Sequence, residues 1–568
     1  MKNMKFSEII KNNKILKTQL SNELYPIAIL SNIMVHQIKD IGEYALRLEG
    51  INCHIDLGDY DNILQDSIKY KNVKVIIIFW ELYNLFDGLQ YKIELLTNEE
   101  FQDIINKVKL EIDMVLNNLK NVPLILINEF STLIFEPYAL HQTRLSELSA
   151  ILNEYIKSKI STNIKIIPID KIISRISIQK SIDLRYYYSS KTFYSIDLYK
   201  EYFDYIRPIF LAVNGKSKKA LIFDCDNTLW KGVLGEDGFD KIKVYTEIQY
   251  LALELSKKGI IIGLCSKNNP NDVDEVLQDH KDMILRDKDI IIKKVNWNDK
   301  VTNLEAIAKD LNIGLDSLVF IDDSDFEINL INEKLPMVTT IQVPQREYEY
   351  SMLIRKISTL FYNPTQTDED TNKLQMYKTQ IQRKDAEETI GNIEDYLKSL
   401  NLEISVFVDD FQQISRIAQM TQKTNQFNLT TKRYTENEIQ SYMNAHDTSV
   451  IAIGVKDKFG DNGIVGLSIL NYVGKKAIID TLLMSCRVLG RNIEYKFMDI
   501  IIEIAKEKKI SIIQAEYIKT LKNIQVSDYY DGMGFQSELK TEDKSNYQIS
   551  LDMYKTKKLN YIGVKNGK

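Results

Sequence analysis

Cysteine, histidine and long apolar runs are all scarce in this sequence of 568 residues. The few cysteines do not form a disulfide framework, and the five histidines lack the paired Cys/His spacing of structural zinc sites. Apolar runs such as Val75–Trp80 are too short to span a membrane, and the N-terminus lacks the apolar core of a secretory signal. Lys and Arg number 73 against 79 Asp and Glu, so no basic face for nucleic acid stands out. We expect a cytoplasmic protein that binds neither nucleic acid nor membrane. Its four cysteines are Cys53, Cys225, Cys265 and Cys486.

The length and the alternation of apolar runs predict several α/β domains. At about 150 residues per domain, three or four globular domains are expected. Short strands alternate with longer helical stretches in residues 26–214 and again in 216–362, which predicts parallel sheets covered by helices. Residues 1–25 are predicted to be a polar, helix-forming arm, and 363–401 a helical connector.

The last region, 402–556, has a different pattern. Its apolar runs lie close together, and Asp461–Gly463 between two of them is a strong hairpin signal. A stretch of helical period, Ile493–Lys506, follows. This order of strand, hairpin, strand and helix predicts a mixed α+β domain.

The second region carries polar side chains where its predicted strands end. Ala220–Phe223 is followed by Asp224–Thr228, Ile260–Cys265 by Ser266–Asn268, and Leu318–Ile321 by Asp322 and Asp323. Any one such residue is usually only a helix cap, and that explanation is sufficient for Ser324 taken by itself. Three such ends in order, with Lys300 between the second and third, favour a site at the carboxyl edge of a sheet. Carboxylates, a hydroxyl and a lysine suit Mg²⁺-dependent phosphoryl chemistry, in which a carboxylate can serve as the nucleophile.

This series, D-x-D-x-T followed by Ser, Lys and D-D, resembles the haloacid dehalogenase (HAD) superfamily. The resemblance implies a Rossmann-like core in which Asp224 is the nucleophile and Asp226 the general acid/base. Asp323 is either part of the metal shell or a helix cap. The resemblance further implies a phosphate-binding role for Thr228 and Ser266, with Lys267 and Asn268 beside them, and a charge-stabilising role for Lys300. The implied metal set is Asp224, Asp226 through its backbone carbonyl, Asp322 and Asp323.

Longer strings resemble the FkbH-like family from about residue 26 to 540. They include Asp224–Trp230, Gly232–Gly238, Lys423–Thr430 and Ser485–Arg491. Members divert 1,3-bisphosphoglycerate, release phosphate and load glyceryl as a thioester onto the phosphopantetheine arm of an acyl carrier protein, for polyketide or related biosynthesis. The chain departs from the family where Ser324-Asp325 and Glu327-Ile328 replace an expected Asn-Pro and Glu-Arg. The lost arginine bears on how a second substrate phosphate is held. Lys231 either replaces its charge or is simply a solvated surface residue.

The flanking domains resemble other enzymes. The first is similar to SGNH hydrolases, with Ser31 in the position of their nucleophile. The stretch 182–188, where such hydrolases would have Asp-x-x-His, contains no histidine, so we expect no hydrolysis there. The third is similar to GNAT acyltransferases, whose phosphate loop corresponds to Arg487, Gly490 and Arg491 and would hold the pantetheine arm at a helix N-terminus.

The sequence leaves two questions open. An enzyme-bound glyceryl thioester needs a cysteine, and Cys225 between two catalytic aspartates competes with Cys486 before the phosphate loop. Two other functions also compete with carrier loading: a plain Mg²⁺-dependent phosphatase, and a scaffold that docks carrier proteins without catalysis.

Overall fold

The computed structural model describes residues 1, 3–20, 23–135, 142–362, 368–520 and 522–566. The chain divides into two compact units, one of residues 1–214 with 434–438, and one of 215–433 with 439–568. Within the described residues, no helix is both long enough and apolar enough to cross a lipid bilayer.

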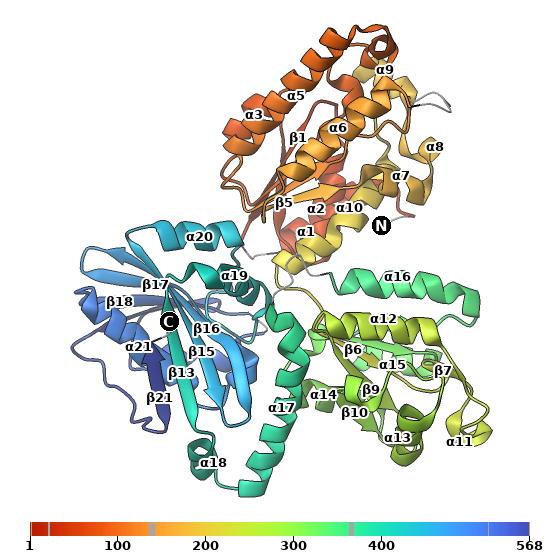
Figure 1. Cartoon of the computed structure of the whole chain (residues 1–568). Helices are drawn as coiled ribbons and strands as arrows, with labels where there is room; N and C mark the ends of the chain where they lie inside the picture. Colours follow the sequence, from red (N-terminus) through yellow and green to blue (C-terminus); the bar gives the residue numbers. More distant parts are fainter. Residues whose placement is uncertain (2, 21–22, 136–141, 363–367, 521, 567–568) are drawn as a thin grey trace. The chain divides into compact units, whose positions relative to one another are not determined.

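Unit 1 is a parallel sheet with helices around it (Figure 1). Its strand order, β2-β1-β3-β4-β5, is that of a doubly wound α/β fold. The central strand β3 is buried at every position because its apolar residues face helices on both sides. The strands are β1 Tyr25–Ser31, β2 Cys53–Leu57, β3 Val75–Phe79, β4 Leu124–Asn128 and β5 Ile164–Ile167. The helices are α1 Phe6–Gln19, α2 Ile38–Leu48, α3 Ile63–Lys69, α4 Leu89–Lys92, α5 Asn98–Asn118, α6 Arg144–Ser158, α7 Ile169–Ile176, α8 Ile178–Ser181, α9 Leu184–Ser190 and α10 Ile196–Val213.

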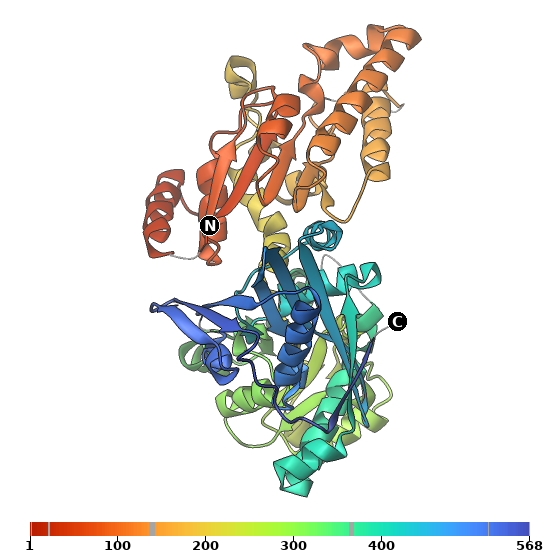
Figure 2. The same cartoon turned by 90° about the vertical axis from the view of Figure 1, so that its left-hand side faces the viewer.

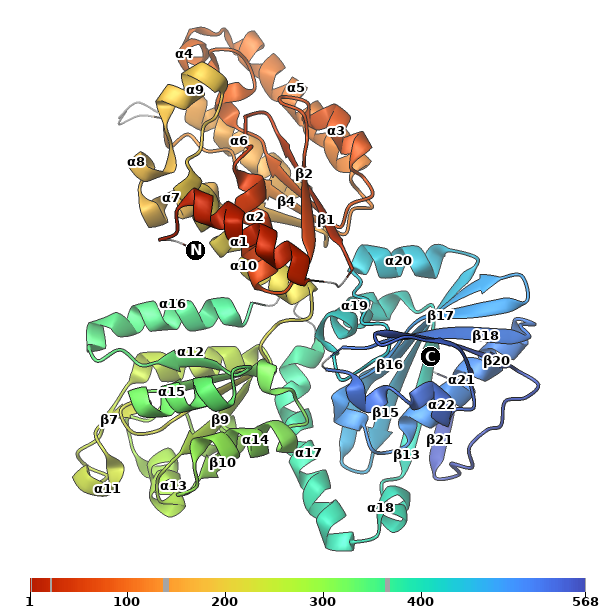
Figure 3. The same cartoon turned by 180° about the vertical axis from the view of Figure 1, so that it is seen from behind.

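Unit 2 begins with a second parallel sheet, of order β10-β9-β6-β11-β12. Alternate residues of β6 face opposite cores, one formed with α12, α13 and α16 and the other with α14 and α15 (Figure 3). A small hairpin of β7 and β8 with α11 extends from the chain after β6. The strands are β6 Ala220–Phe223, β7 Trp230–Lys231, β8 Lys243–Val244, β9 Ile261–Ser266, β10 Ile292–Val295, β11 Leu318–Asp322 and β12 Thr339–Gln342. The helices are α11 Leu234–Asp237, α12 Thr246–Lys257, α13 Pro270–Asp279, α14 Lys300–Asp310, α15 Asp325–Lys334 and α16 Tyr350–Leu360.

The rest of unit 2 is a mixed, largely antiparallel sheet of nine strands, with α21 packed against it (Figure 2). Its strands are β13 Leu402–Val408, β14 Phe427–Asn428, β15 Thr448–Asp457, β16 Gly460–Val473, β17 Lys476–Met484, β18 Ile512–Ile518, β19 Gln536–Lys540, β20 Lys544–Ser550 and β21 Ile562–Asn566. The remaining helices are α17 Asp368–Ile390, α18 Ile393–Ser399, α19 Ile414–Lys423, α20 Glu436–Asn444, α21 Ile493–Glu507 and α22 Tyr529–Gly532.

Two features of this third sheet bear on function. The parallel pair β17 and β18 is joined only from Lys476 to Ile479, and beyond that point β14 pairs with β17 while Ile518 donates to the carbonyl of Leu429. A segment of the same chain therefore fills the space between the two strands. Helix α17 packs between this sheet and the helices of the second sheet, as Figures 1 and 3 both show.

Candidate functional site

Three adjacent strands of the second sheet end at one place. Asp224 follows β6, Ser266 ends β9 on one side of it, and Asp322 ends β11 on the other. Because these strands are parallel, their carboxyl ends meet at the same edge of the sheet. Lys300 begins α14 and reaches this edge from the helix layer.

An ammonium joins the two strand-end aspartates. Lys300 Nζ lies 2.8 Å from Asp224 Oδ1 and 2.6 Å from Asp322 Oδ2, and all three side chains are buried. Asp224, Asp322 and Asp323 also present carboxylate oxygens that all lie within 4.8 Å of one another. We call these three aspartates the acid cluster. Three carboxylates against one ammonium leave negative charge that a divalent cation with oxygen ligands would balance.

Burial and ion pairing compete at this cluster. Burial raises the pKa of Asp224, and the Lys300 ammonium and a hydrogen bond from Ser266 act in the opposite direction. Burial and the Asp224 charge raise the pKa of Asp322 as well. Burial alone would lower the pKa of Lys300, yet the two aspartates hold it above its usual value. Lys300 therefore stays an ammonium and favours the ionised form of both partners.

Asp226 lies outside the acid cluster and is held by three donors. Trp230 Nε1 and the Leu234 amide donate to Oδ1 at 2.9 and 3.1 Å, and Asn268 Nδ2 donates to Oδ2 at 3.0 Å. Burial raises the pKa of Asp226, which favours a protonated form suited to an acid. Trp230 was not predicted as a site residue, although it lies only four positions after Asp226 in the sequence.

The phosphate-binding residues expected from the sequence separate into two groups. Ser266 and Asn268 contact Asp224 and Asp226, so both are at the site. Thr228 is 0% exposed, and its hydroxyl has no hydrogen-bond partner within the described residues, so its role in binding phosphate stays a prediction. Lys267 Nζ pairs with Glu327 at 2.7 Å, which competes with any phosphate for its charge.

Two further side chains have clear local roles. Ser324 caps α15 by accepting from the Glu327 amide, so Asp323 is not the cap and its carboxylate is left to the acid cluster. Lys231, the candidate replacement for the missing arginine, is exposed and pairs with Glu347 at 3.2 Å. Lys231 therefore forms an ion pair at the surface, and its role in holding a phosphate stays a prediction.

The position of Cys225 argues against its role as the acyl-carrying thiol. Its side chain is 0% exposed and belongs to the apolar core that also holds Leu221 and Phe223. Burial, reinforced by the Asp224 charge, raises its pKa well above the ordinary value, so the reactive thiolate is disfavoured. Cys265 is buried in the opposite core of the same sheet.

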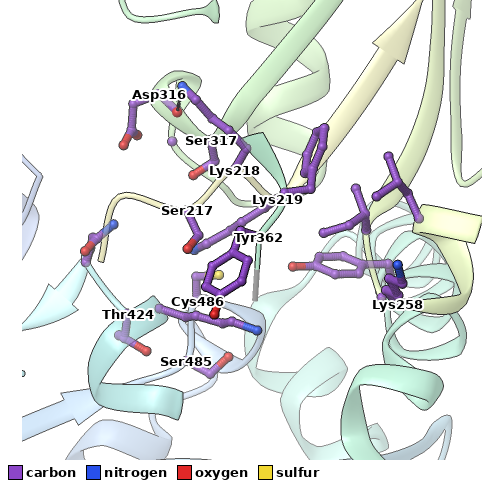
Figure 4. Close-up of a pocket in the computed structure, with 18 of the residues that line it drawn as sticks. Ser217, Lys218, Lys219, Lys258, Asp316, Ser317, Tyr362, Thr424, Ser485 and Cys486 are labelled. Atoms are coloured by element: carbon purple, nitrogen blue, oxygen red, sulfur yellow. Dashed lines mark hydrogen bonds between the residues drawn. The ribbon is translucent and has the colours of Figure 1, made fainter. Parts of the chain in front are cut away.

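Cys486 is partly exposed and lies at the other edge of the sheet. It lines a cavity together with Lys219, Ile260 and Ser317, which directly precede β6, β9 and β11 (Figure 4). Asp224 follows β6, so at about 3.3 Å per residue Lys219 and Asp224 are roughly 16 Å apart along the strand. The thiol and the acid cluster are therefore two separate places.

The expected pantetheine loop is only partly available to a ligand. Arg491 is buried, donates to Asp457 Oδ2 at 3.1 Å and to the Arg487 carbonyl, and burial lowers its pKa to about 10. The Arg491 side chain is therefore used within the fold, and the role of this loop in holding a pantetheine phosphate stays a prediction. Arg487 is also buried but lines the same cavity as Cys486. Gly490 has a φ of 80° with open space where a Cβ would lie.

No protein-family model and no curated protein match the chain. A similar solved structure is the N-terminal part of a Bacteroides fragilis protein that contains a phosphatase domain, crystallised with Mg. Its TM-score is 0.55 at 24% identity, and the match covers 64% of this chain and all of that one (100%), which shows a shared fold over that part. An alanine N-acetyltransferase of ribosomal protein S18 from Escherichia coli matches at a TM-score of 0.21 and 10% identity, over 27% of this chain and 96% of that one. Mutant spermidine/spermine N-acetyltransferase of Vibrio cholerae matches at 0.21 and 13%, over 27% and 95%. Similarity as low as that of the two acetyltransferases carries no conclusion about fold or function.

Proposed function

We propose that the acid cluster hydrolyses phosphate esters in a Mg²⁺-dependent, HAD-type reaction. The observation that carries the proposal is the buried contact of Lys300 with Asp224 and Asp322 at adjacent strand ends. The shared fold with a structure that contains a phosphatase domain complexed with Mg supports it.

The chain's own residues account for each step of this reaction. The Asp224 carboxylate attacks phosphorus, the bond from phosphorus to the leaving oxygen breaks, and an aspartyl phosphate forms. Asp226 gives its proton to the leaving oxygen, and then accepts one from the water that hydrolyses the aspartyl phosphate. Lys300 stays charged beside Asp224 and offsets the negative charge that gathers there.

The donor set fits a magnesium ion. Asp224, Asp322 and Asp323 would hold it, because all three offer carboxylate oxygens within 4.8 Å of one another. When bound, Mg²⁺ neutralises part of the charge on the phosphate and on the cluster.

We further propose that the physiological reaction loads glyceryl onto an acyl carrier protein, starting from 1,3-bisphosphoglycerate. The resemblance of the long strings to FkbH-like proteins supports this substrate. A protein-borne substrate also suits three exposed aromatic residues that come after strands of this sheet. Trp297, Phe326 and Tyr348 follow β10, β11 and β12 in the chain and are 75%, 69% and 70% exposed. Exposed aromatic residues of this kind are enriched in protein interfaces.

Among the described cysteines, Cys486 is the better candidate for the enzyme thioester, because Cys225 is buried in the core. The Cys486 thiolate would attack the carbonyl carbon of the acyl phosphate, so that a C–S bond forms and phosphate leaves with the electrons of the C–O bond. The carrier thiol would then displace Cys486, and the remaining phosphate ester would be hydrolysed at the acid cluster. Loading and hydrolysis would thus occur at two places.

The flanking regions have supporting roles in this proposal. The parallel sheet of unit 1 suits an SGNH-like domain that no longer hydrolyses, since the stretch 182–188 around Asp183 contains no histidine. The strand, loop and helix around Gly490 suit a GNAT-like domain that receives the pantetheine arm.

Phosphate release tests the hydrolytic half. With p-nitrophenyl phosphate, we expect turnover with Mg²⁺, none with a chelator, and a loss of at least about a thousandfold in Asp224→Asn. Asp552→Asn is the matched control, because this exposed aspartate follows β20 in the third sheet, whereas the acid cluster belongs to the second sheet. Unchanged turnover in Asp224→Asn would contradict the proposal and favour a non-catalytic scaffold.

Intact-protein mass spectrometry tests the loading half. The enzyme receives Mg²⁺ and freshly generated 1,3-bisphosphoglycerate, with and without a pantetheinylated carrier. We expect a glyceryl adduct that moves to the carrier and is lost in Cys486→Ala but not in Cys225→Ala. Phosphate release without an adduct on either protein would identify a plain phosphatase.

A further inference from the structure

The cavity beside Cys486 is a separate feature of unit 2. It has a volume of about 520 Å³, within the range of small-molecule sites. Figure 4 shows that its wall combines the segment before β6, with Ser217, Lys218 and Lys219, and the end of β17, with Ser485 and Cys486.

Positive charge dominates the wall of this cavity. Seven cationic side chains line it against two carboxylates, those of Glu254 and Asp316, in a chain whose net charge is −6. A concave wall of one sign concentrates the potential and attracts a counter-ion of opposite sign. The cations are Lys218, Lys219, Lys258, Lys423, Lys522, Arg416 and Arg487.

The two carboxylates neutralise only part of this charge. Asp316 pairs with Lys522, and its backbone carbonyl accepts from Lys218 Nζ at 2.7 Å. Glu254 pairs with Lys258 at 2.5 Å. Lys219 forms no ion pair within the described part of the chain. The lysines are therefore held in place around a site that still favours an anion.

The remaining wall suits the carbon part of an organic ligand. Leu251, Met337 and Met420 supply apolar surface, and Tyr362 also lines the cavity. The amide oxygen of Gln426, another wall residue, is buried without a hydrogen-bond partner in the described residues. A hydroxyl or amide group on a ligand would satisfy it.

We propose that this cavity is a second ligand site that binds a phosphorylated organic molecule next to the Cys486 thiol. The phosphate would lie among the lysines and the carbon part against the apolar wall. The inference deepens the proposed function and rests on it for the acyl phosphate. Its test measures binding and not turnover. A failure of the ligand site can therefore be distinguished from a failure of the proposed function.

The thiol itself reports on occupancy. Cys53, Cys225 and Cys265 are buried, so iodoacetamide should alkylate the native full-length chain at Cys486 first. We expect pyrophosphate to slow this alkylation at least about fivefold, as followed by peptide mass spectrometry. Protection by free 3-phosphoglycerate would indicate a small phosphorylated acid, and protection by acetyl-coenzyme A a phosphate on a pantetheine arm. Neither ligand carries a free thiol, so neither consumes iodoacetamide.

Charge variants connect the protection to the lysines. Lys219→Gln and Lys258→Gln should alkylate in the absence of ligand yet lose most of the protection, and Lys309→Gln, an exposed change on α14, should keep it. Asp224→Asn should also keep the protection, because the acid cluster lies at the opposite edge of the sheet. The proposal is overturned if none of the three ligands protects, if the lysine variants are protected as well as the wild type, or if Asp224→Asn removes the protection.

Discussion

At the scale of single residues, Glu81 is the clearest source of pH dependence outside the acid cluster. It lies just after β3, is buried, and accepts a hydrogen bond from Tyr194 at 2.8 Å. Burial raises its pKa from 4.5 to about 7. Between these values the folded state keeps a proton that the unfolded chain has lost. The free energy of unfolding must therefore fall as the pH rises from about 4.5 to 7, by about 3 kcal/mol in all.

We predict that Glu81→Gln removes this dependence, because the amide cannot ionise and still accepts from Tyr194. The variant should match the wild type near pH 4.5 and exceed it in stability at pH 8. Urea unfolding of both proteins at the two pH values measures the difference. An equal difference at both pH values would contradict a buried, ionisable Glu81.

A second residue-scale prediction concerns Asp457, which pairs with two buried arginines. Arg383 binds both its oxygens at 2.8 Å, and Arg491 binds one at 3.1 Å. Asp457→Asn would leave two buried guanidinium groups without a negative partner, at a cost of about 3–5 kcal/mol. Thermal unfolding should show this loss, whereas exposed Asp552→Asn should leave stability unchanged. A small effect of Asp457→Asn would mean that water or other residues compensate the arginines.

Some of these residue positions could be predicted from the sequence, and others could not. The strand ends identified the acid cluster, because D-x-D, Ser and D-D follow or end adjacent strands and Lys300 begins a helix between them. The orientation of Cys225 was also accessible, since Leu221, Phe223 and Cys225 follow the two-residue period of one sheet face. The pairing of Arg491 with Asp457 was not, because the partners are 34 positions apart and meet only after folding.

At the scale of elements, β9 depends on a glycine. A Cβ at Gly263 would lie 2.8 Å from side-chain atoms of Ile222 and Ile292, on both neighbouring strands. We predict that Gly263→Ala destabilises the second sheet by about 1–3 kcal/mol, because the strands must shift. Gly235→Ala is the control, since a Cβ there meets nothing within 4 Å. Denaturant midpoints of the two variants provide the comparison, and equal midpoints would contradict the close packing.

The boundaries of strands were predictable where apolar runs are continuous. Where the runs are interrupted, the prediction of boundaries failed. Strand β2 alternates polar and apolar residues at the sheet edge, so no run marks it. The hairpin signal at Asp461–Gly463 correctly predicted an antiparallel hairpin, formed by β15 and β16, but not its turn. The turn lies at Lys458-Phe459, and Asp461–Gly463 is part of β16. Asp461 Oδ1 accepts from the Gly463 amide at 2.7 Å, with Gly463 at a φ of 64°. These turn-forming residues produce an irregularity in the strand pairing instead.

The connector region illustrates the same limit. Residues 368–399 are helical, as α17 and α18, whereas 363–367 lie outside the described residues. Polar composition predicted the helices but not the burial of Tyr377 and Arg383 in α17. That burial comes from packing against two sheets, which a local pattern does not encode.

At the scale of the whole molecule, the division into two compact units predicts how the chain unfolds. The chain passes between the units after Asn214 and on either side of 434–438, so most packing is internal to one unit or the other. Units with separate cores need not unfold together. We predict two calorimetric transitions for the full chain. Glu81→Gln at pH 8 should raise only one of them, because Glu81 belongs to unit 1, and Gly263→Ala should lower only the other. If both variants moved a single shared transition, the two units would be one cooperative body, and a change near Glu81 would then be felt at the acid cluster.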